Sequence, residues 1–208
     1  MNKISIKIRY LLVLFFLANF VILTATGIRL YRYLFFTPCR LEVNCRGYGL
    51  DIDWMKQWEN QERDGSQGIL AMAGWNFAGR KEIYAVGVER TDTAQLLKVY
   101  GSMEQVFPVR ILSGVYGLAG RENACVLSRD LAEALFGSDQ VTGEQVCLDG
   151  EEGEKIFLEI AGVIDREGKY MLVPMSEGEV ERIAVLFDKR FQAREKMEEN
   201  LAIPADSE

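Results

Sequence analysis

The chain has 208 residues, of which 49% are hydrophobic and 26% charged, and its net charge is −7 with no histidine. This length and composition are typical of a globular domain with room for an attachment. Residues 1–46 hold seven basic residues and one acidic residue, whereas residues 47–208 hold 17 basic and 30 acidic ones. Because an acidic body repels phosphate backbones, we expect no nucleic-acid partner.

The first predicted element is a transmembrane helix over residues 10–28, YLLVLFFLANFVILTATGI, which carries no charge. At the helical rise it spans about 28 Å, close to the hydrocarbon thickness of a bilayer. A cleaved signal peptide is the alternative, but it needs a shorter apolar core and small residues before the cleavage point. The basic residues on the two flanks do not decide the orientation. We expect an uncleaved single-pass anchor in the cell membrane, with residues 1–9 cytoplasmic and the acidic body extracytoplasmic.

Residues 29–47 are predicted to be a basic and aromatic connector, which contains Cys39 and Cys45. These two cysteines, and the pair Cys125 and Cys147 further along the chain, are candidates for two disulfides if the body is exported. Each pair is equally compatible with free thiols. Because the chain has no C-x-x-C pair and no histidine, the sequence predicts no zinc site.

The core domain is predicted to occupy residues 48–202. Asp51 or Asp53 is placed to cap a helix that ends near residue 62, because a carboxylate accepts hydrogen bonds from the first free amides of a helix. The elements that follow are strands over 69–75 and 82–88, a short helix over 93–100 that Gly101 ends, and a strand within 103–112.

A loop over residues 113–120 has a glycine at every third position. A phosphate-binding loop would open a helix, whereas this one is followed by Arg121 and a predicted strand. We therefore expect a flexible loop rather than a nucleotide site. Its candidate contact residues are Gly114, Tyr116, Gly117 and Gly120.

Residues 125–137, CVLSRDLAEALFG, predict a buried strand followed by a helix with apolar residues four positions apart. Ser128 falls at the N-cap, and Gly137 falls where a left-handed residue ends a helix. A nucleophile elbow needs small residues two positions before and after its serine, and Val126 and Asp130 stand there instead. Ser128 is therefore predicted to be a helix cap and not a nucleophile.

The remaining predicted elements are strands over 145–148, 155–164 and 170–174, a strand or helix over 183–187, an exposed helix over 191–201 and a disordered tail over 203–208. Irregular alternation of helices and strands, with hairpin-length gaps late in the chain, predicts an α+β fold with a mixed sheet. No set of residues assembles a reaction, a cofactor site or a metal site, so we expect a protein that is not an enzyme.

Residues 121–164 contain D-L-A-E-A-L-F-G after an apolar strand and Ser-Arg, then V-T-G-E-Q-V-C-L-D-G, then I-F-L-E-I-A-G-V-I-D. This pattern resembles the extracytoplasmic core domain of MacB/FtsX-type ABC transporter permeases. Segments 84–88, 112–114 and 170–175 resemble further steps of the pattern, and with the N-terminal anchor the resemblance covers nearly all of 8–200. The matching positions in the central segment are Leu131, Ala132, Leu135, Phe136, Gly137, Val141, Gly143, Val146, Leu148, Gly162, Val163 and Asp165.

The resemblance implies one transmembrane helix followed by a MacB-like extracytoplasmic core domain, with ATPase or permease subunits of an ABC transporter, and the lipid bilayer, as partners. Family members carry three further membrane helices after this domain, whereas this chain has one apolar run of membrane length. Coupling to an ATPase would therefore pass through a partner chain. The resemblance thus implies a non-catalytic permease-like subunit or accessory protein. The alternative is an anchored binding or sensor module, unrelated to transport, that reads a peptide or lipid through residues 113–120.

Overall fold

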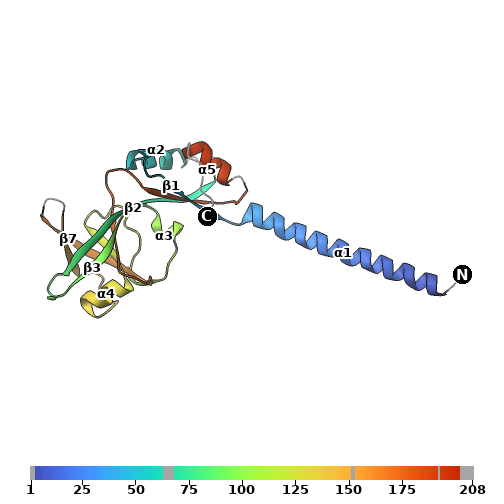
Figure 1. Cartoon of the computed structure of the whole chain (residues 1–208), viewed down its shortest axis with the longest axis horizontal. Helices are drawn as coiled ribbons and strands as arrows, with labels where there is room; N and C mark the ends of the chain where they lie inside the picture. Colours follow the sequence, from blue (N-terminus) through green and yellow to red (C-terminus); the bar gives the residue numbers. More distant parts are fainter. Residues whose placement is uncertain (1–2, 63–67, 151–152, 192, 202–208) are drawn as a thin grey trace.

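The computed structural model describes residues 3–62, 68–150, 153–191 and 193–201, which form one long helix and a β-rich body (Figure 1). The helix, α1 (Lys3–Phe36), has 34 residues and extends away from the body as a rod about 51 Å long. Within the described residues it is the one helix that is long and apolar enough to cross a membrane, over Tyr10–Phe36, and the most apolar part of that stretch has no buried residue. The helix thus extends beyond the predicted 10–28 at both ends.

Most of the segment 29–47, predicted to be a connector, is helix or strand in the protein. Residues 29–36 continue α1, because no helix-breaking residue occurs before Pro38. Strand β1 (Cys39–Asn44) then pairs antiparallel with β9 (Arg182–Phe187). The inward positions of β1 are apolar, with Cys39 and Val43 buried, so this strand belongs to the core of the body.

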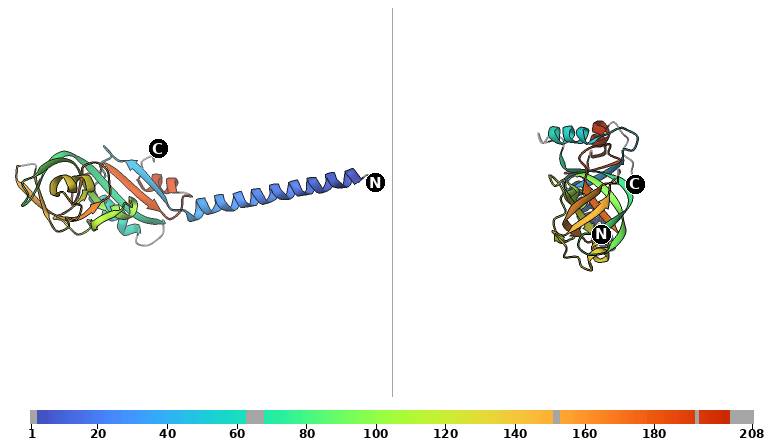
Figure 2. Two further views of the ribbon diagram at one scale, coloured as in Figure 1. Left: turned by 90° about the horizontal axis from the view of Figure 1, so that it is seen from below. Right: turned by 90° about the vertical axis from the view of Figure 1, so that its left-hand side faces the viewer.

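The body is built on a mixed sheet of nine strands that runs β1-β9-β2-β3-β8-β5-β7-β4, with β6 pairing both β2 and β7. Because β6 joins β2 to β7, the strands β2, β3, β8, β5, β7 and β6 form a closed ring. The left-hand view of Figure 2 shows this ring of strands with α4 lying over it. The strands beyond β1 and β9 are β2 (Ile69–Ala85), β3 (Thr91–Gly101), β4 (Ile111–Gly114), β5 (Ala124–Ser128), β6 (Gln145–Asp149), β7 (Lys155–Ile164) and β8 (Tyr170–Pro174).

Strand β2 makes the closure possible because its two halves have different partners. Its first half, from Ile69 to Trp75, pairs with β9, and its end, from Ile83 to Ala85, pairs with β6. A bulge between Phe77 and Arg80 bends the strand between these two pairings. The two strands predicted over 69–75 and 82–88 are therefore one bent strand.

Two further predictions in this region were wrong. Residues 93–100, predicted to be a helix, are part of β3, which is buried on both faces and so lacks the alternation of apolar and polar residues that marks a half-buried strand. Residues 103–112 are not one strand but the short helix α3 (Met103–Val106) followed by the start of β4. The break lies near Pro108, which has no amide to donate to a sheet.

The other predicted elements are confirmed. Helix α2 (Ile52–Glu62) is capped by Asp51, whose Oδ1 accepts a hydrogen bond of 2.8 Å from the amide of Trp54. Residues 183–187 are a strand, β9, and not a helix. The predicted helix over 191–201 is α5 (Ala193–Leu201), and the helix after Ser128 is α4 (Arg129–Phe136). The predicted tail over 203–208 lies outside the described residues.

The buried side chains form three clusters. The first fills the ring and is closed by Leu131 and Leu135 of α4. The second lies on the outer face of the ring, under α3 and the segment around Tyr116. The third lies between the β1–β9–β2 part of the sheet and helices α2 and α5, which lie side by side in Figure 1. The body is therefore layered on both faces of its sheet, as an α+β fold requires.

Candidate functional site

A cavity in the described body has a volume of about 450 Å³. Its walls come from chain segments that are far apart in sequence: the ends of β3 and β8, the start of α3, Tyr116 with residues 118–122, and Glu59 of α2. Apolar side chains such as Met103, Leu118 and Met175 form much of the lining, and Glu59, Arg121 and Glu122 supply its charges. A concave site that combines an apolar lining with a few polar groups is typical of small-molecule and peptide-side-chain pockets.

Tyr116 is the residue of the predicted contact loop that the fold buries most deeply. Its side chain is only 3% exposed, and within the described residues its hydroxyl has no hydrogen-bond partner. Burial raises the pKa of this phenol to about 12, with the Glu104 carboxylate adding to the rise and the Arg166 guanidinium opposing it. Glu104 Oε2 is also buried and unpartnered among the described groups. Two buried polar atoms without partners are costly, and they lie beside the cavity that Tyr116 lines.

The other residues of the predicted contact loop 113–120 divide between the sheet and the cavity. Gly114 is the last residue of β4 and pairs with Gly162 of β7, so it belongs to the sheet. Its φ of +67° and the backbone of Ala161 beside it leave no room for a side chain. Gly120 lines the cavity, and Gly117 lies against the carboxylate of Glu104. The contact role of these four residues stays a prediction.

Tyr100 fixes the position of Glu59 at the cavity. Its hydroxyl donates a hydrogen bond of 3.2 Å to Glu59 Oε2, which ties α2 to the end of β3. Burial, together with the charge of Glu59, raises the pKa of Tyr100 to about 12. The phenol therefore remains a donor over the physiological pH range, and the Glu59 carboxylate is held as its acceptor.

Ser128 occupies the predicted N-cap position, but its hydroxyl does not cap the helix. The side chain is fully buried, and Oγ accepts a hydrogen bond of 2.9 Å from the amide of Tyr170. The predicted capping bond is replaced because β8 runs beside this end of β5 and presents an unpaired amide. Gly137 has the predicted left-handed conformation, with φ of 75°.

All four cysteines are buried free thiols, so neither candidate disulfide is present. Cys39 and Cys45 are separated by the whole of an extended strand, about 20 Å, which no disulfide spans. Cys125 lies on β5 and Cys147 on β6. These strands flank opposite edges of β7, since Glu159 pairs with both of them, and two strand spacings amount to about 10 Å.

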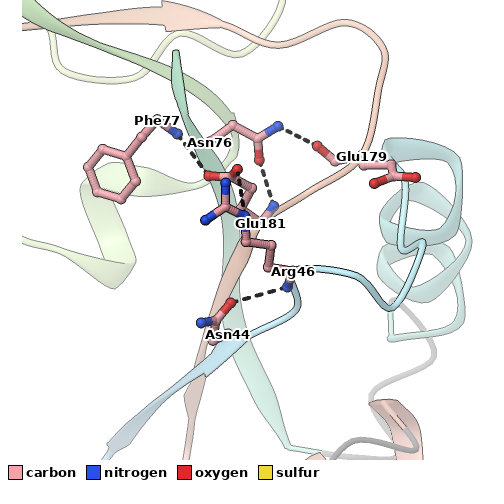
Figure 3. A network of polar contacts seen from close by, with 6 residues as sticks. All are labelled: Asn44, Arg46, Asn76, Phe77, Glu179 and Glu181. Carbon is pink, nitrogen blue, oxygen red and sulfur yellow. Dashed lines mark hydrogen bonds and ion pairs between the residues drawn. The ribbon is translucent and has the colours of Figure 1, made fainter. Parts of the chain in front are cut away.

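The described residues hold no group of three His, Cys, Asp or Glu side chains arranged for a metal ion. Their polar contacts serve the fold instead, and the network in Figure 3 is an example. Asn76 of β2 donates from its side-chain amide to the carbonyl of Glu179 and accepts from the amide of Glu181 at 2.6 Å. Glu181 in turn contacts Arg46 Nε at 3.6 Å and the amide of Phe77 at 3.3 Å. These bonds hold the segment after β1 and the approach to β9 against β2.

The cavity was not predicted as a site, because sequence reasoning found only the loop that forms one of its walls. Its other walls are segments whose proximity depends on the β3–β8 pairing and on the packing of α2. The signals that were present in the sequence are Tyr116 and Leu118, two apolar residues two positions apart within a glycine-rich loop. Both point into the second core cluster.

No family model and no curated protein sequence matches this chain. The fold, by contrast, is similar to solved structures. The extracellular domain of the ABC-type transporter YknZ from Gram-positive bacteria aligns with a TM-score of 0.56 and 16% identity, over 76% of this chain and 88% of that one. The periplasmic region of MacB from Actinobacillus actinomycetemcomitans aligns with a TM-score of 0.61 and 13% identity, over 84% and 88%.

A domain of a protein described as a permease from Porphyromonas gingivalis is similar as well, with a TM-score of 0.53 and 18% identity over 67% of this chain and 70% of that one. These identities establish likeness of fold. The chain therefore carries, behind one apolar N-terminal helix, the mixed-sheet fold of the periplasmic region of MacB, the extracellular domain of YknZ and a domain of a permease.

Proposed function

We propose that this protein is a non-catalytic, membrane-anchored subunit or accessory protein of an ABC transporter, and that it acts through its body. The observation that carries the proposal is the combination of one exposed apolar helix with a body whose fold is that of transporter extracytoplasmic domains. The absence of histidine and the burial of Ser128 and of all four thiols support a role in protein contact rather than in catalysis.

The proposed arrangement places residues 1–9 in the cytoplasm, α1 in the membrane and the body outside. Two features support it: no charge interrupts the helix between residues 10 and 28, and the structural neighbours are extracellular or periplasmic domains. Reporter fusions at the C-terminus test this arrangement. Alkaline phosphatase is active only when exported and green fluorescent protein folds poorly when exported, so the first fusion should be active and the second dark. The opposite pattern would reject the arrangement.

Co-purification from detergent extracts tests the partner. The tagged full chain should recover an ABC transporter ATPase or permease subunit. The tagged segment 1–38, which keeps α1 and lacks the body, should recover far less if the body makes the contact. Recovery of no transporter subunit by the full chain, from cells that express such subunits, would contradict the proposal.

A second candidate function, an anchored binding or sensor module, is favoured by one specific observation, the cavity beside Tyr116. An apolar lining with two unpartnered polar atoms nearby suits a small aromatic or peptide-side-chain ligand. Ligand-observed NMR with neutral aromatic fragments tests it on the body, residues 38–208. Ala119→Trp, at the exposed rim of the cavity, should abolish fragment binding, whereas Gln105→Trp, exposed and outside the lining, should not. Equal binding by both variants would reject this candidate.

A further inference from the structure

The junction between α1 and the body brings together residues about 150 positions apart in sequence. The amide of Phe191 donates a hydrogen bond of 2.9 Å to the carbonyl of Leu34 near the end of α1. The rings of Phe35 and Phe191 stack with centroids 4.8 Å apart, and the Arg190 guanidinium lies 4.6 Å above the ring of Tyr33. The end of the helix and the segment before α5 therefore form one surface.

This surface, which we call the collar, is both basic and aromatic. It consists of Arg29, Tyr31, Arg32, Tyr33, Phe36, Arg190 and Phe191. Its rings are exposed to an extent that is unusual for aromatic side chains: 56% for Tyr31, 68% for Phe36 and 46% for Phe191. Its three arginines are exposed, and none of them forms an ion pair with any described residue. The collar thus presents uncompensated positive charge.

The helix length places the collar at the level of lipid headgroups. From Tyr10 to Arg29 the helix rises about 28 Å, which matches the hydrocarbon core, and Arg32 lies one turn further along. Tyrosine side chains favour this interfacial layer, and arginine pairs with phosphate through two parallel hydrogen bonds. Residues 47–208, Arg190 included, carry 30 acidic against 17 basic residues, so an anionic surface repels the body outside the collar.

We infer that the collar binds the headgroups of anionic phospholipids. The three guanidinium groups provide the charge complementarity, and the helix provides continuity with the bilayer. Arg190 differs from the other two arginines because it belongs to the body and not to the helix. A phosphate held between Arg190 and Arg32 would join the two parts of the protein, and the Tyr33 ring would keep Arg190 in place. The inference rests on the proposed location of α1 in a membrane.

Native mass spectrometry of the full chain, released from nanodiscs that contain equal amounts of phosphatidylglycerol and phosphatidylcholine, tests the inference. The wild type should retain phosphatidylglycerol at least fivefold over phosphatidylcholine. The triple variant Arg29→Gln, Arg32→Gln, Arg190→Gln should retain both lipids about equally. The control triple variant Arg80→Gln, Arg90→Gln, Arg110→Gln removes the same charge from exposed positions on the body and should keep the wild-type ratio.

A wild-type ratio within twofold of one, or a collar variant with the wild-type ratio, would overturn the inference. Arg190→Gln alone, which leaves the helix sequence intact, should lower the ratio at least twofold and serves if the triple variant inserts poorly. Raising the salt concentration during nanodisc assembly should reduce the ratio, since the contact is electrostatic. Carbonate extraction of the wild type distinguishes the proposed membrane location of α1 from lipid binding by the collar. A chain that carbonate releases from the membrane contradicts the proposed location. A chain that stays in the membrane but shows no lipid preference contradicts lipid binding by the collar alone.

Discussion

At the scale of single residues, the most instructive side chain is Asn76. The ladder between β2 and β9 ends where Trp75 pairs with Arg182. Beyond that point the side-chain amide of Asn76 replaces the backbone pairing. Its oxygen accepts a hydrogen bond from the amide of Glu181, and its nitrogen donates one to the carbonyl of Glu179. The side chain thus has the hydrogen-bonding pattern of a peptide group and extends the sheet by one step.

Asn76→Ala should lower the free energy of unfolding by about 1–2 kcal/mol, because it leaves two backbone groups without partners. For a chain of this length the melting temperature of the purified protein should fall by about 3–6 °C. Asn76→Asp should also destabilise, since it keeps the acceptor and loses the donor. Asn60→Ala, on the exposed face of α2, is the matched control and should leave the melting temperature nearly unchanged. Identical effects of Asn76→Ala and the control would show that the network in Figure 3 contributes nothing.

The buried thiols predict a loss of stability at alkaline pH. Burial raises the pKa of Cys45 from 9.0 to about 11, and it raises the pKa of Cys125 as well. The folded state therefore holds these protons more tightly than the unfolded state does. The contribution of Cys45 is complete below pH 9 and is lost as the pH rises from 9 towards 11, whereas the loss for Cys125 continues to higher pH.

The contribution of Cys45 should be on the order of 2–3 kcal/mol, from a pKa rise of about two units. It is measured by urea unfolding of wild type and Cys45→Ala between pH 7 and pH 11. The variant should be less stable at pH 7 because of the cavity that it leaves, but its stability should fall less steeply above pH 9. If stability falls equally with pH in the wild type and the variant, the pKa of Cys45 is the same in the folded and unfolded states.

At the scale of elements, the sequence predicted those whose chemistry is local. The helix after Ser128 has apolar residues at helical spacing and a terminal Gly137, and these signals need no tertiary context. The prediction for strand β3 was wrong because its structure depends on tertiary context. It is buried on both faces, so Leu96 and Leu97 are both apolar and face different core clusters, and the pattern lacks period two. Its assignment as a strand depends on neighbours that no local pattern reveals.

The close approach of Val115, which follows β4, to strand β7 explains a glycine that belongs to the permease-like pattern. Gly162 pairs with Gly114 on one edge of β7 and with Val126 on the other. A β-carbon at residue 162 would overlap the carbonyl oxygen of Val115, which is backbone and cannot rotate away. The segment that leads to Tyr116 therefore passes so close to β7 that only glycine fits.

Gly162→Ala should destabilise the protein by about 1–3 kcal/mol, the usual cost of overpacking a core. Because the strain would push residues 115–118 outwards, Tyr116 should also become more exposed, which acrylamide quenching and hydrogen exchange of this segment would detect. Gly117→Ala is the matched control. The β-carbon of residue 117 would meet the Glu104 carboxylate at 3.4 Å, an ordinary contact, and no loss of stability is expected. A stable Gly162→Ala variant would contradict the close packing of β4 on β7.

At the scale of the whole molecule, the sequence indicated an anchor and an α+β body with a mixed sheet, and the resemblance supplied its fold. The ring of strands could not be predicted from the sequence, because its closure depends on β6 pairing with both β2 and β7. The cavity depends in turn on that ring, since β3 and β8 meet at its wall and Glu59 reaches it from α2. Contacts that span up to about a hundred residues leave no trace in local periodicity.

The position of β1 in the sheet gives a sharp test of where the body begins. The sequence placed the start of the domain at residue 48, whereas the structure includes Cys39–Asn44 as the strand that covers the edge of β9. Without β1, the backbone groups on that edge of β9 lose their partners, and Ile183 and Val185 lose part of the third core cluster.

The chain 38–208 should therefore be soluble and monomeric and should unfold in one cooperative transition. The chain 48–208, which lacks β1, should be less stable by at least about 3 kcal/mol and should aggregate through the exposed edge of β9. Circular dichroism melts and size-exclusion chromatography of the two chains compare them directly. Replacing Val43 by Asp within 38–208 should reproduce much of the loss, because Val43 is only 1% exposed, whereas Glu42→Gln on the same strand should not. A chain 48–208 as stable as 38–208 would show that β1 is a connector after all.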